Sequence, residues 1–181
     1  MSRSENLAYL GPAGSFTHQA ALNLLPGDAQ LLDCSDLEQV FEALFSGRAR
    51  YAVAALNSAA GPIARTHEVI AAGQVKDLAR TQIAVSFDLY RQGDDDSDLE
   101  GVFGHEKALA QIKDWIDRTG VSALSMPSNT AGLEAIAQRR AGWGAVGPPG
   151  LAKQFGLEVV AHALESPAQN HTEFVLLSLP T

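Results

Sequence analysis

The sequence predicts an α/β fold with two lobes, each built on a parallel-rich sheet, and a cleft between them. Short apolar segments alternate with helical segments along the 181 residues, as in proteins whose parallel strands are covered by helices on both faces. The alternation occurs in two similar sets. A long alternating segment at 81–90 lies between the sets and could cross from one lobe to the other. We therefore expect one lobe from residues 1–80 plus 158–181 and the other from 81–157.

The first set contains three short strands and three helices. Ser15 or Thr17 can cap the first helix. The second helix begins at Ser35 or Asp36, carries apolar residues at the i, i+3, i+4 spacing of an amphipathic helix, and ends at Gly47. We expect the strands at 7–10, 30–33 and 51–56, and the helices at about 15–25, 36–46 and 62–72.

The second set follows an acidic segment at 92–100, which has no core pattern and is expected to be a surface loop. One helix of this set carries Leu109, Ile112, Trp115 and Ile116 on one side. We expect its strands at 101–103, 123–126 and 143–146, further helices at 129–141 and 151–155, and closing strands near 157–163 and 173–179.

The composition excludes several functional classes. Twenty-one acidic residues against 13 basic ones give a net charge of −8, so nucleic acid and anionic membranes are poor partners. No apolar stretch approaches the ~18 residues of a membrane helix, and the first six residues do not resemble a signal peptide. The lone Cys34 favours a reducing, cytoplasmic compartment. The five histidines lack metal-ligand spacing, and we expect no metal or organic cofactor.

The segment from Leu7 to His18 is the most distinctive in the chain. A strand is followed by a glycine turn and then by a helix N-terminus with hydroxyls and free N–H groups. Such a junction can bind an anion without a charged side chain. It can equally be an ordinary strand–turn–helix junction whose hydroxyls only cap the helix. It does not match the glycine patterns of nucleotide-binding loops.

Gly11-Pro-Ala-Gly-Ser-Phe-Thr-His18 resembles the opening signature of the prephenate dehydratases, which is usually Gly-Pro-Glu-Gly-Thr-Phe-Ser-His. Further segments resemble the family's motifs in the same order along the chain. They are Phe41–Val53, Leu56–Ser58, His105–Gln111, Pro127–Ala131, Phe155–Val159 and Asn170–Phe174. The resemblance implies a two-lobed fold similar to type II periplasmic binding proteins and a cytoplasmic enzyme that forms a homodimer.

The resemblance also implies a substrate and a reaction. Prephenate is a dianion with one carboxylate on a cyclohexadienol ring and one on a pyruvyl arm. Prephenate dehydratases remove the ring carboxylate as carbon dioxide and the C4 hydroxyl as water, which leaves phenylpyruvate for phenylalanine biosynthesis. These lyases need no cofactor.

Matching motif positions assign the site residue by residue. The resemblance implies that Thr172 assists departure of the hydroxyl and that Asn57 and Gln111 act with it. It implies that substrate is bound by Gly11, Ser15, Thr17, Ser58, Thr66, Ser128, Asn129, Thr130, Ala131, Glu173 and Phe174.

Several of these residues also have an ordinary structural interpretation. Thr172 can be a β-branched residue that opens a strand, and Asn57 with Ser58 can form a turn. Gln111 can be a solvated helix position, and residues 128–130 can cap the next helix. Capping and carboxylate binding are compatible at a helix N-terminus.

The chain departs from the family's pattern at two single residues and in one short segment. Glu173 stands where the family has arginine, Leu56 stands where it has glutamate, and residues 84–87 replace a histidine-rich strand. The chain ends at Thr181, where typical members continue into a phenylalanine-sensing ACT domain, so we expect no feedback domain. A carboxylate in place of a guanidinium repels a dianion. Two alternatives therefore stay open, a non-aromatising prephenate decarboxylase and a non-catalytic protein that binds a small anion.

Overall fold

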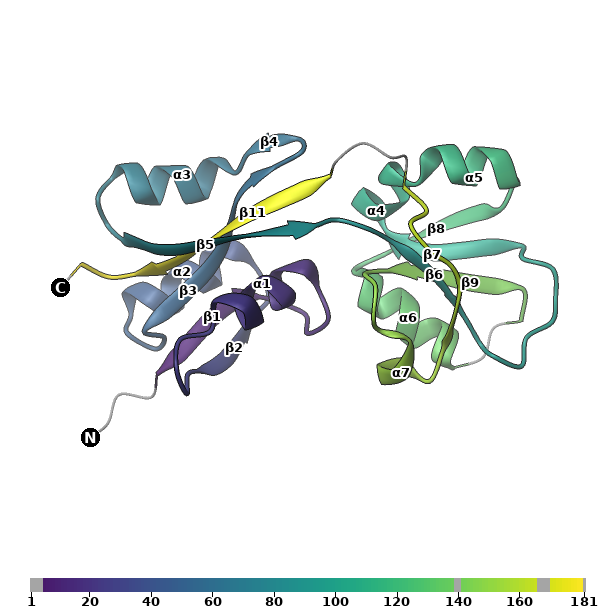
Figure 1. Cartoon of the computed structure of the whole chain (residues 1–181), viewed down its shortest axis with the longest axis horizontal. Helices are drawn as coiled ribbons and strands as arrows, with labels where there is room; N and C mark the ends of the chain where they lie inside the picture. The colour runs from purple at the N-terminus through teal and green to yellow at the C-terminus, as the bar shows by residue number, and fades with distance from the viewer. Residues whose placement is uncertain (1–4, 139–140, 166–169, 181) are drawn as a thin grey trace. The chain divides into compact units, whose positions relative to one another are not determined.

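Figure 1 shows the computed structural model, which describes residues 5–138, 141–165 and 170–180. The chain forms two compact units, each with its own sheet. Unit 1 comprises Met1–Val85 and Asn170–Thr181, and unit 2 comprises Ser86–Gln169. The sequence placed the return to the first lobe at residue 158. The boundary falls later because Glu158–Ala161 pairs with a strand of unit 2.

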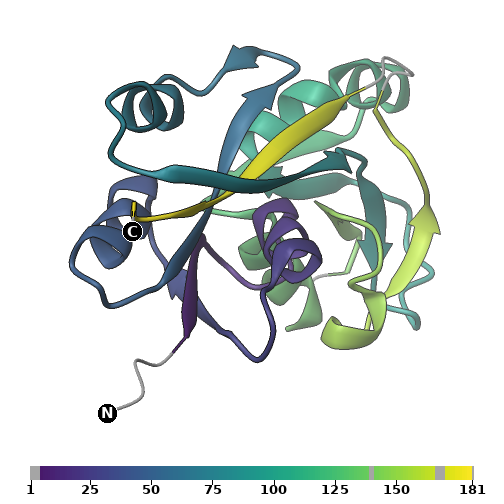
Figure 2. The same cartoon turned by 60° about the vertical axis from the view of Figure 1, so that its left-hand side comes forward.

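The sheet of unit 1 has the strand order β2-β1-β3-β11-β5, with β4 paired to β3. β1 is parallel to β2 and β3, whereas β11 runs antiparallel between β3 and β5, as Figure 2 shows. The strands are β1 (Asn6–Leu10), β2 (Gln30–Cys34), β3 (Tyr51–Ser58), β4 (Gly61–Pro62), β5 (Lys76–Ala84) and β11 (His171–Ser178).

Three helices cover the two faces of this sheet: α1 (Phe16–Leu24), α2 (Leu37–Phe45) and α3 (Ala64–Ala71). Successive side chains of a strand point to opposite faces. Leu7 and Tyr9 of β1 accordingly pack in one core with residues of α1. Ala8 between them packs in a second core with residues of α2 and α3. Unit 1 is therefore a sheet buried on both sides, as the near-continuous apolar strands predicted.

The sheet of unit 2 has the order β10-β6-β9-β7-β8, in which β7 is parallel to β8 and β9. Its strands are β6 (Asp88–Arg91), β7 (Gly101–His105), β8 (Ser122–Met126), β9 (Trp143–Gly147) and β10 (Glu158–Ala161). Its helices are α4 (Glu106–Gln111), α5 (Lys113–Thr119), α6 (Asn129–Ala137) and α7 (Ala152–Phe155).

The predicted α/β class is confirmed, but both sheets are mixed rather than parallel throughout. β11 in unit 1 and β6 and β10 in unit 2 pair antiparallel with their neighbours. The expected strand at 81–90 is divided, since β5 and β6 belong to different sheets and are separated by residues 85–87.

Two helices also differ from their predictions. The expected helix through Leu109 and Ile116 is interrupted at the buried Ile112, where α4 ends and α5 begins. The helix expected from Pro62 begins instead at Ala64, because Pro62 is still paired with β3. The last residues of the helix expected at 129–141 lie partly outside the described residues.

The acidic segment at 92–100 is a loop, as predicted, and one carboxylate anchors it. Asp95 pairs with Arg91 at 2.9 Å and accepts a hydrogen bond of 3.0 Å from the backbone N–H of Gly142. Hydrogen bonds from Ser97, followed by those from Arg91 and Gly142, lower the pKa of Asp95 to about 2. The loop is thus held to β6 and to the start of β9 by a carboxylate that stays ionised.

Candidate active site

The carboxyl ends of the parallel strands of unit 1 meet at one edge of its sheet. β1 and β3 are parallel and end there at Leu10 and Ser58. β11 is antiparallel to β3 and therefore starts at this edge, with Glu173 opposite Asn57. In open α/β sheets ligands bind at such an edge. The fold thus brings Gly11, Asn57, Ser58, Thr172 and Glu173 to the place where a ligand is expected.

The turn between β1 and α1 is closely packed. The N–H of Gly11 donates to the carbonyl of Cys34 over 2.9 Å. A Cβ at position 11 would lie 1.7 Å from Oδ1 of Asp33, so a larger residue would displace the Asp33 side chain. The Asp33 side chain is exposed and can move, so position 11 tolerates a larger residue only with that displacement.

The N-terminus of α1 is capped from within. Ser15 Oγ accepts a hydrogen bond of 3.1 Å from the His18 N–H, and the Gly14 N–H donates to His18 Nδ1 over 3.0 Å. The capping interpretation of Ser15 is confirmed. Thr17 lies in the first turn and is half-buried. An anion at this helix start stays a prediction.

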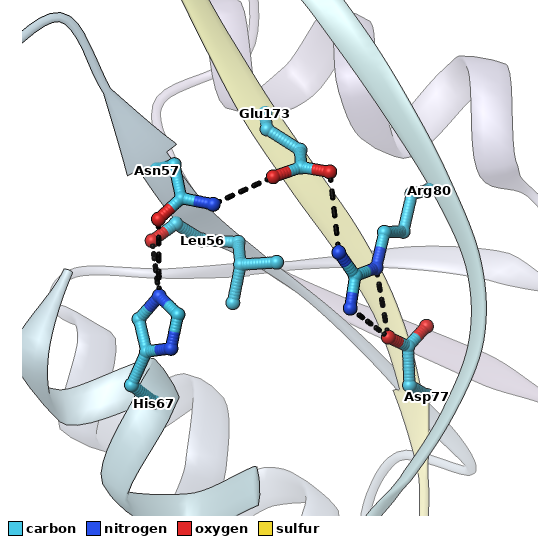
Figure 3. Close-up of polar contacts among 6 residues, drawn as sticks. All are labelled: Leu56, Asn57, His67, Asp77, Arg80 and Glu173. Carbon is cyan, nitrogen blue, oxygen red and sulfur yellow. Dashed lines mark hydrogen bonds and ion pairs between the residues drawn. The ribbon is translucent and has the colours of Figure 1, made fainter. Parts of the chain in front are cut away.

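The central contact of the site joins β3 to β11. Nδ2 of Asn57 donates to Oε2 of Glu173 over 2.6 Å, and Oε1 of Glu173 lies 3.3 Å from Nη1 of Arg80 on β5 (Figure 3). Arg80 is held in turn by Asp77, with its Nε 2.8 Å and its Nη2 2.7 Å from Asp77 Oδ2. The Asp77 hydrogen bond, and secondarily Glu173, raises the pKa of Arg80.

His67 on α3 contacts the same amide from the other side. Its Nε2 lies 3.1 Å from Asn57 Oδ1 and 3.1 Å from the backbone carbonyl of Leu56 (Figure 3). Neighbouring Ser58 donates its hydroxyl to the Gly61 carbonyl over 3.2 Å. Ser58 thus closes the β3–β4 hairpin, which was its ordinary structural interpretation.

Adjacent side chains of a strand face opposite sides, so Glu173 is expected either to point away from a site that Thr172 faces or to be offset by a nearby donor. The Glu173 side chain is only 23% exposed and contacts Asn57 directly. The pairing of β11 with β3 shifts register only after Glu173, between Glu173 and Phe174, so Thr172 and Glu173 still alternate along the strand. Asn57 and Arg80 are the nearby donors that offset this carboxylate.

A second group of predicted residues lies at the corresponding edge of unit 2, where the parallel strands β7 and β8 end. Ser128 caps α6, since its Oγ accepts from the Ala131 N–H over 3.0 Å. Asn129 Oδ1 accepts from the His105 N–H over 2.8 Å and so ties α6 to the end of β7. Thr130 lies in the first turn of this nine-residue helix. Gln111 is the exposed last residue of α4.

Two predicted contact residues are buried within unit 1. Thr66 is fully buried on α3, and its Oγ1 has no hydrogen-bond partner among the described residues. Phe174 is 2% exposed and packs in the core beside α1. Their contact with a ligand stays a prediction, as does a single cleft lined by both groups of residues.

Sequence reasoning missed His67, Arg80 and Asp77. The helix after β3 returns along that strand, which is a signal that a polar residue early in α3 reaches Asn57. Arg80 was detectable only from the pairing of β5 with β11. In the part of the chain that the structure describes, no group of three His, Cys, Asp or Glu side chains could hold a metal ion. Within the same residues, no helix is long and apolar enough to cross a membrane.

Comparison with known proteins identifies relatives along nearly the whole chain. The model of the prephenate dehydratase family matches residues 7–181. The bifunctional chorismate mutase/prephenate dehydratase of Neisseria gonorrhoeae is 29% identical over 182 residues, which cover 98% of this chain and 50% of that protein. The chain therefore spans about half the length of the first curated relatives that it matches.

Solved structures share the fold. The prephenate dehydratase of Arthrobacter aurescens, solved with L-Phe, has a TM-score of 0.81 at 26% identity over 97% of this chain and 60% of its own. A quorum-quenching acylase, GqqA, has a TM-score of 0.78 at 22% identity, covering 98% and 65% of the two chains. A Parabacteroides distasonis protein described as an ABC transporter has a TM-score of 0.53 at 13% identity, covering 99% and 67%. The last two show the fold alone. Both the family match and the ordered motifs lead to one conclusion: the chain belongs to the prephenate dehydratase family.

Proposed function

We propose that the chain converts prephenate to phenylpyruvate, as a carbon–oxygen lyase of phenylalanine biosynthesis. One observation carries the proposal. In a member of this family, Asn57 lies near the end of β3 and Thr172 lies at the start of the neighbouring β11, both at the carboxyl edge of the unit 1 sheet. Both residues are matches to the family's motifs, and both are half-buried rather than packed away.

The reaction needs little chemistry from the protein. The prephenate dianion takes up one proton and yields carbon dioxide, water and the phenylpyruvate monoanion. Aromatisation of the ring drives the two bond cleavages, so the protein has to orient the ring and assist the leaving hydroxyl. Free threonine is a poor acid. Thr172 therefore acts by a preorganised hydrogen bond to the departing C4 oxygen rather than through a shifted pKa.

Neutral groups bind the substrate carboxylates in this proposal. The N-termini of α1 and α6 carry the partial positive charge of their helix dipoles, and both follow the carboxyl end of a strand. Ser15 and Ser128 cap these helices and fix their first turns. Backbone amides can thus stabilise carboxylates in a protein whose net charge is −8.

Glu173 favours a second candidate, a prephenate decarboxylase. Its carboxylate contacts Asn57 at the position where the family has arginine. A negative group there weakens the binding of a dianion and opposes the negative charge that develops on a departing hydroxide. A decarboxylase releases carbon dioxide but leaves the hydroxyl on the ring. No hydroxide departs in that reaction, so the carboxylate of Glu173 does not oppose it in this way.

Product identification distinguishes these functions. The protein is incubated with prephenate at neutral pH, and the products are identified by mass spectrometry against a reaction without protein. The proposal predicts phenylpyruvate. A product heavier by one water indicates the decarboxylase, and unchanged prephenate that nevertheless binds indicates a non-catalytic anion-binding protein.

We also propose a cytoplasmic homodimer without nucleic-acid or membrane partners. The acidic charge and the lone, buried Cys34 support the compartment, and family membership supports the assembly. Size-exclusion chromatography with light scattering tests the dimer, and a mass equal to one chain at micromolar concentration contradicts it.

A further inference from the structure

The hydrogen bonds around Asn57 have one consistent direction. Nε2 of His67 lies 3.1 Å from both the Leu56 carbonyl and Asn57 Oδ1. A carbonyl oxygen can only accept, so the Leu56 contact requires that Nε2 carry the hydrogen. The atom of Asn57 that faces His67 must then also be an acceptor, which is Oδ1.

The contact of Asn57 with Glu173 requires the same orientation of the amide. Glu173 Oε2 lies 2.6 Å from the second polar atom of the Asn57 amide, and an ionised carboxylate only accepts. Rotating the amide by 180° would place Oδ1 against the carboxylate and Nδ2 against the Nε2 hydrogen of His67. Two favourable contacts would become two repulsive ones. Amide orientations are assigned from such networks, and here both ends agree.

The carboxylate that orients Asn57 is itself fixed. Glu173 is largely buried, and its Oε1 pairs with Arg80, which Asp77 holds from the other side (Figure 3). The network therefore runs from a helix through one amide to two strands. Each donor in it faces an acceptor.

We propose that His67 and Glu173 are positioning residues that hold the Asn57 amide in one orientation for the reaction. This rests on the proposed function, which places Asn57 at the substrate. The Asn57 nitrogen carries two hydrogens, and Glu173 takes one. The second is the donor that the fixed amide offers to an anionic substrate. In the rotated state Asn57 would offer its carbonyl oxygen to that anion instead.

Turnover of variants measures this role. His67→Leu and Glu173→Leu each remove one of the two constraints and are expected to lower kcat about threefold to tenfold. The effect is measured in kcat because Glu173→Leu also removes a charge that weakens substrate binding. Because either constraint alone still opposes rotation of the amide, the double variant is expected to lose more than the product of the single losses. His67→Gln and Glu173→Gln keep a donor and an acceptor and are expected to recover most of the activity. Glu68→Leu, at the next and exposed position of α3, is the control and is expected to leave kcat/KM unchanged.

Nitrogen-15 NMR of the free protein gives a readout that does not depend on activity. The neutral His67 ring is expected as the Nε2–H tautomer, and the Asn57 side-chain hydrogen bonded to Glu173 is expected downfield of its position in a solvated amide. In the His67→Leu/Glu173→Leu double variant, the two hydrogens are expected to approach the shifts of a solvated amide.

An Nδ1–H tautomer of His67, or Asn57 shifts that do not respond to these substitutions, would overturn the inference. Failure of the wild-type protein to form phenylpyruvate would overturn the proposed function, while the NMR result would still decide the positioning role. If both the tautomer and turnover are as expected but the conservative variants fail to recover activity, the positioning role is also rejected.

Discussion

Exchanging the charges of Glu173 and Arg80 tests how this site tolerates a carboxylate where its family has arginine. Glu173→Arg alone would place a guanidinium beside Arg80, whose Nη1 lies 3.3 Å from the present carboxylate. It would also point toward the Asn57 hydrogen that now donates to Glu173. The double variant Glu173→Arg/Arg80→Glu keeps the ion pair and the net charge of the protein. It places the positive partner beside Asn57 and replaces the contact of Arg80 with Asp77 by a contact between two carboxylates.

The expected change in KM follows from the position of the charge at residue 173. A unit charge ~4 Å from a substrate carboxylate is worth roughly 1 kcal/mol in water and roughly 4 kcal/mol at the effective dielectric of a protein surface. Position 173 is 23% exposed and lies between these limits. In the exchanged pair the negative charge lies at position 80 on β5, which is farther from the substrate. Its repulsion with Asp77 is small because both side chains are partly exposed. We therefore expect the exchanged pair to lower the KM for prephenate by about tenfold, and to lower kcat because Asn57 loses the carboxylate that orients its amide.

Steady-state kinetics at low and at physiological salt measures the effect. Glu173→Arg alone is expected to lower KM less than the exchanged pair and to lower the melting temperature, because its two guanidiniums repel each other. Added salt should reduce both changes in KM, since exposed charges are screened over ~8–10 Å. If the exchanged pair binds prephenate no more tightly than the wild type at low salt, position 173 is not beside the substrate and the reasoning fails.

Further substitutions test other parts of the molecule. Thr172→Ala is expected to lower kcat at least tenfold with little change in KM, and steady-state kinetics with an unchanged kcat would remove Thr172 from the reaction. Ser128→Asp keeps a good cap but adds a negative charge, so calorimetry should show an unchanged melting temperature while KM rises; Ser128→Ala should instead lose about 1 kcal/mol of stability. Asp95 has a pKa of about 2 in the fold, below its unfolded value of about 3.9, so its stabilising effect is complete above about pH 4 and is lost as the pH falls toward 2. Acid unfolding of the Asp95→Asn variant should lack that part of the pH dependence, and an unchanged profile would contradict the anchoring role.

The local elements were predictable because their signals are local. Ser15, Asp36 and Ser128 each cap the helix that follows them, and each is a small polar residue directly before an apolar periodic segment. The order of strands was not predictable in the same way. β11 inserts between β3 and β5 from more than 80 residues away, and its apolar run has no feature that specifies an antiparallel partner.

The candidate site was also predictable only in part. Asn57 and Thr172 were found from motifs, whereas their polar partners depend on pairing across strands. The contact of Asn57 with Glu173 needs the antiparallel register of β11 against β3. Which charged side chains on adjacent strands pair with each other can be stated only once the order and register of the strands are known.

Simultaneous measurement of carbon dioxide and phenylpyruvate from one reaction tests the central claim most directly. A dehydratase couples the loss of carbon dioxide to the loss of the C4 hydroxyl in a single aromatising step. The account predicts that the two products form at the same rate and in equal amounts from prephenate. Carbon dioxide release without phenylpyruvate would contradict it.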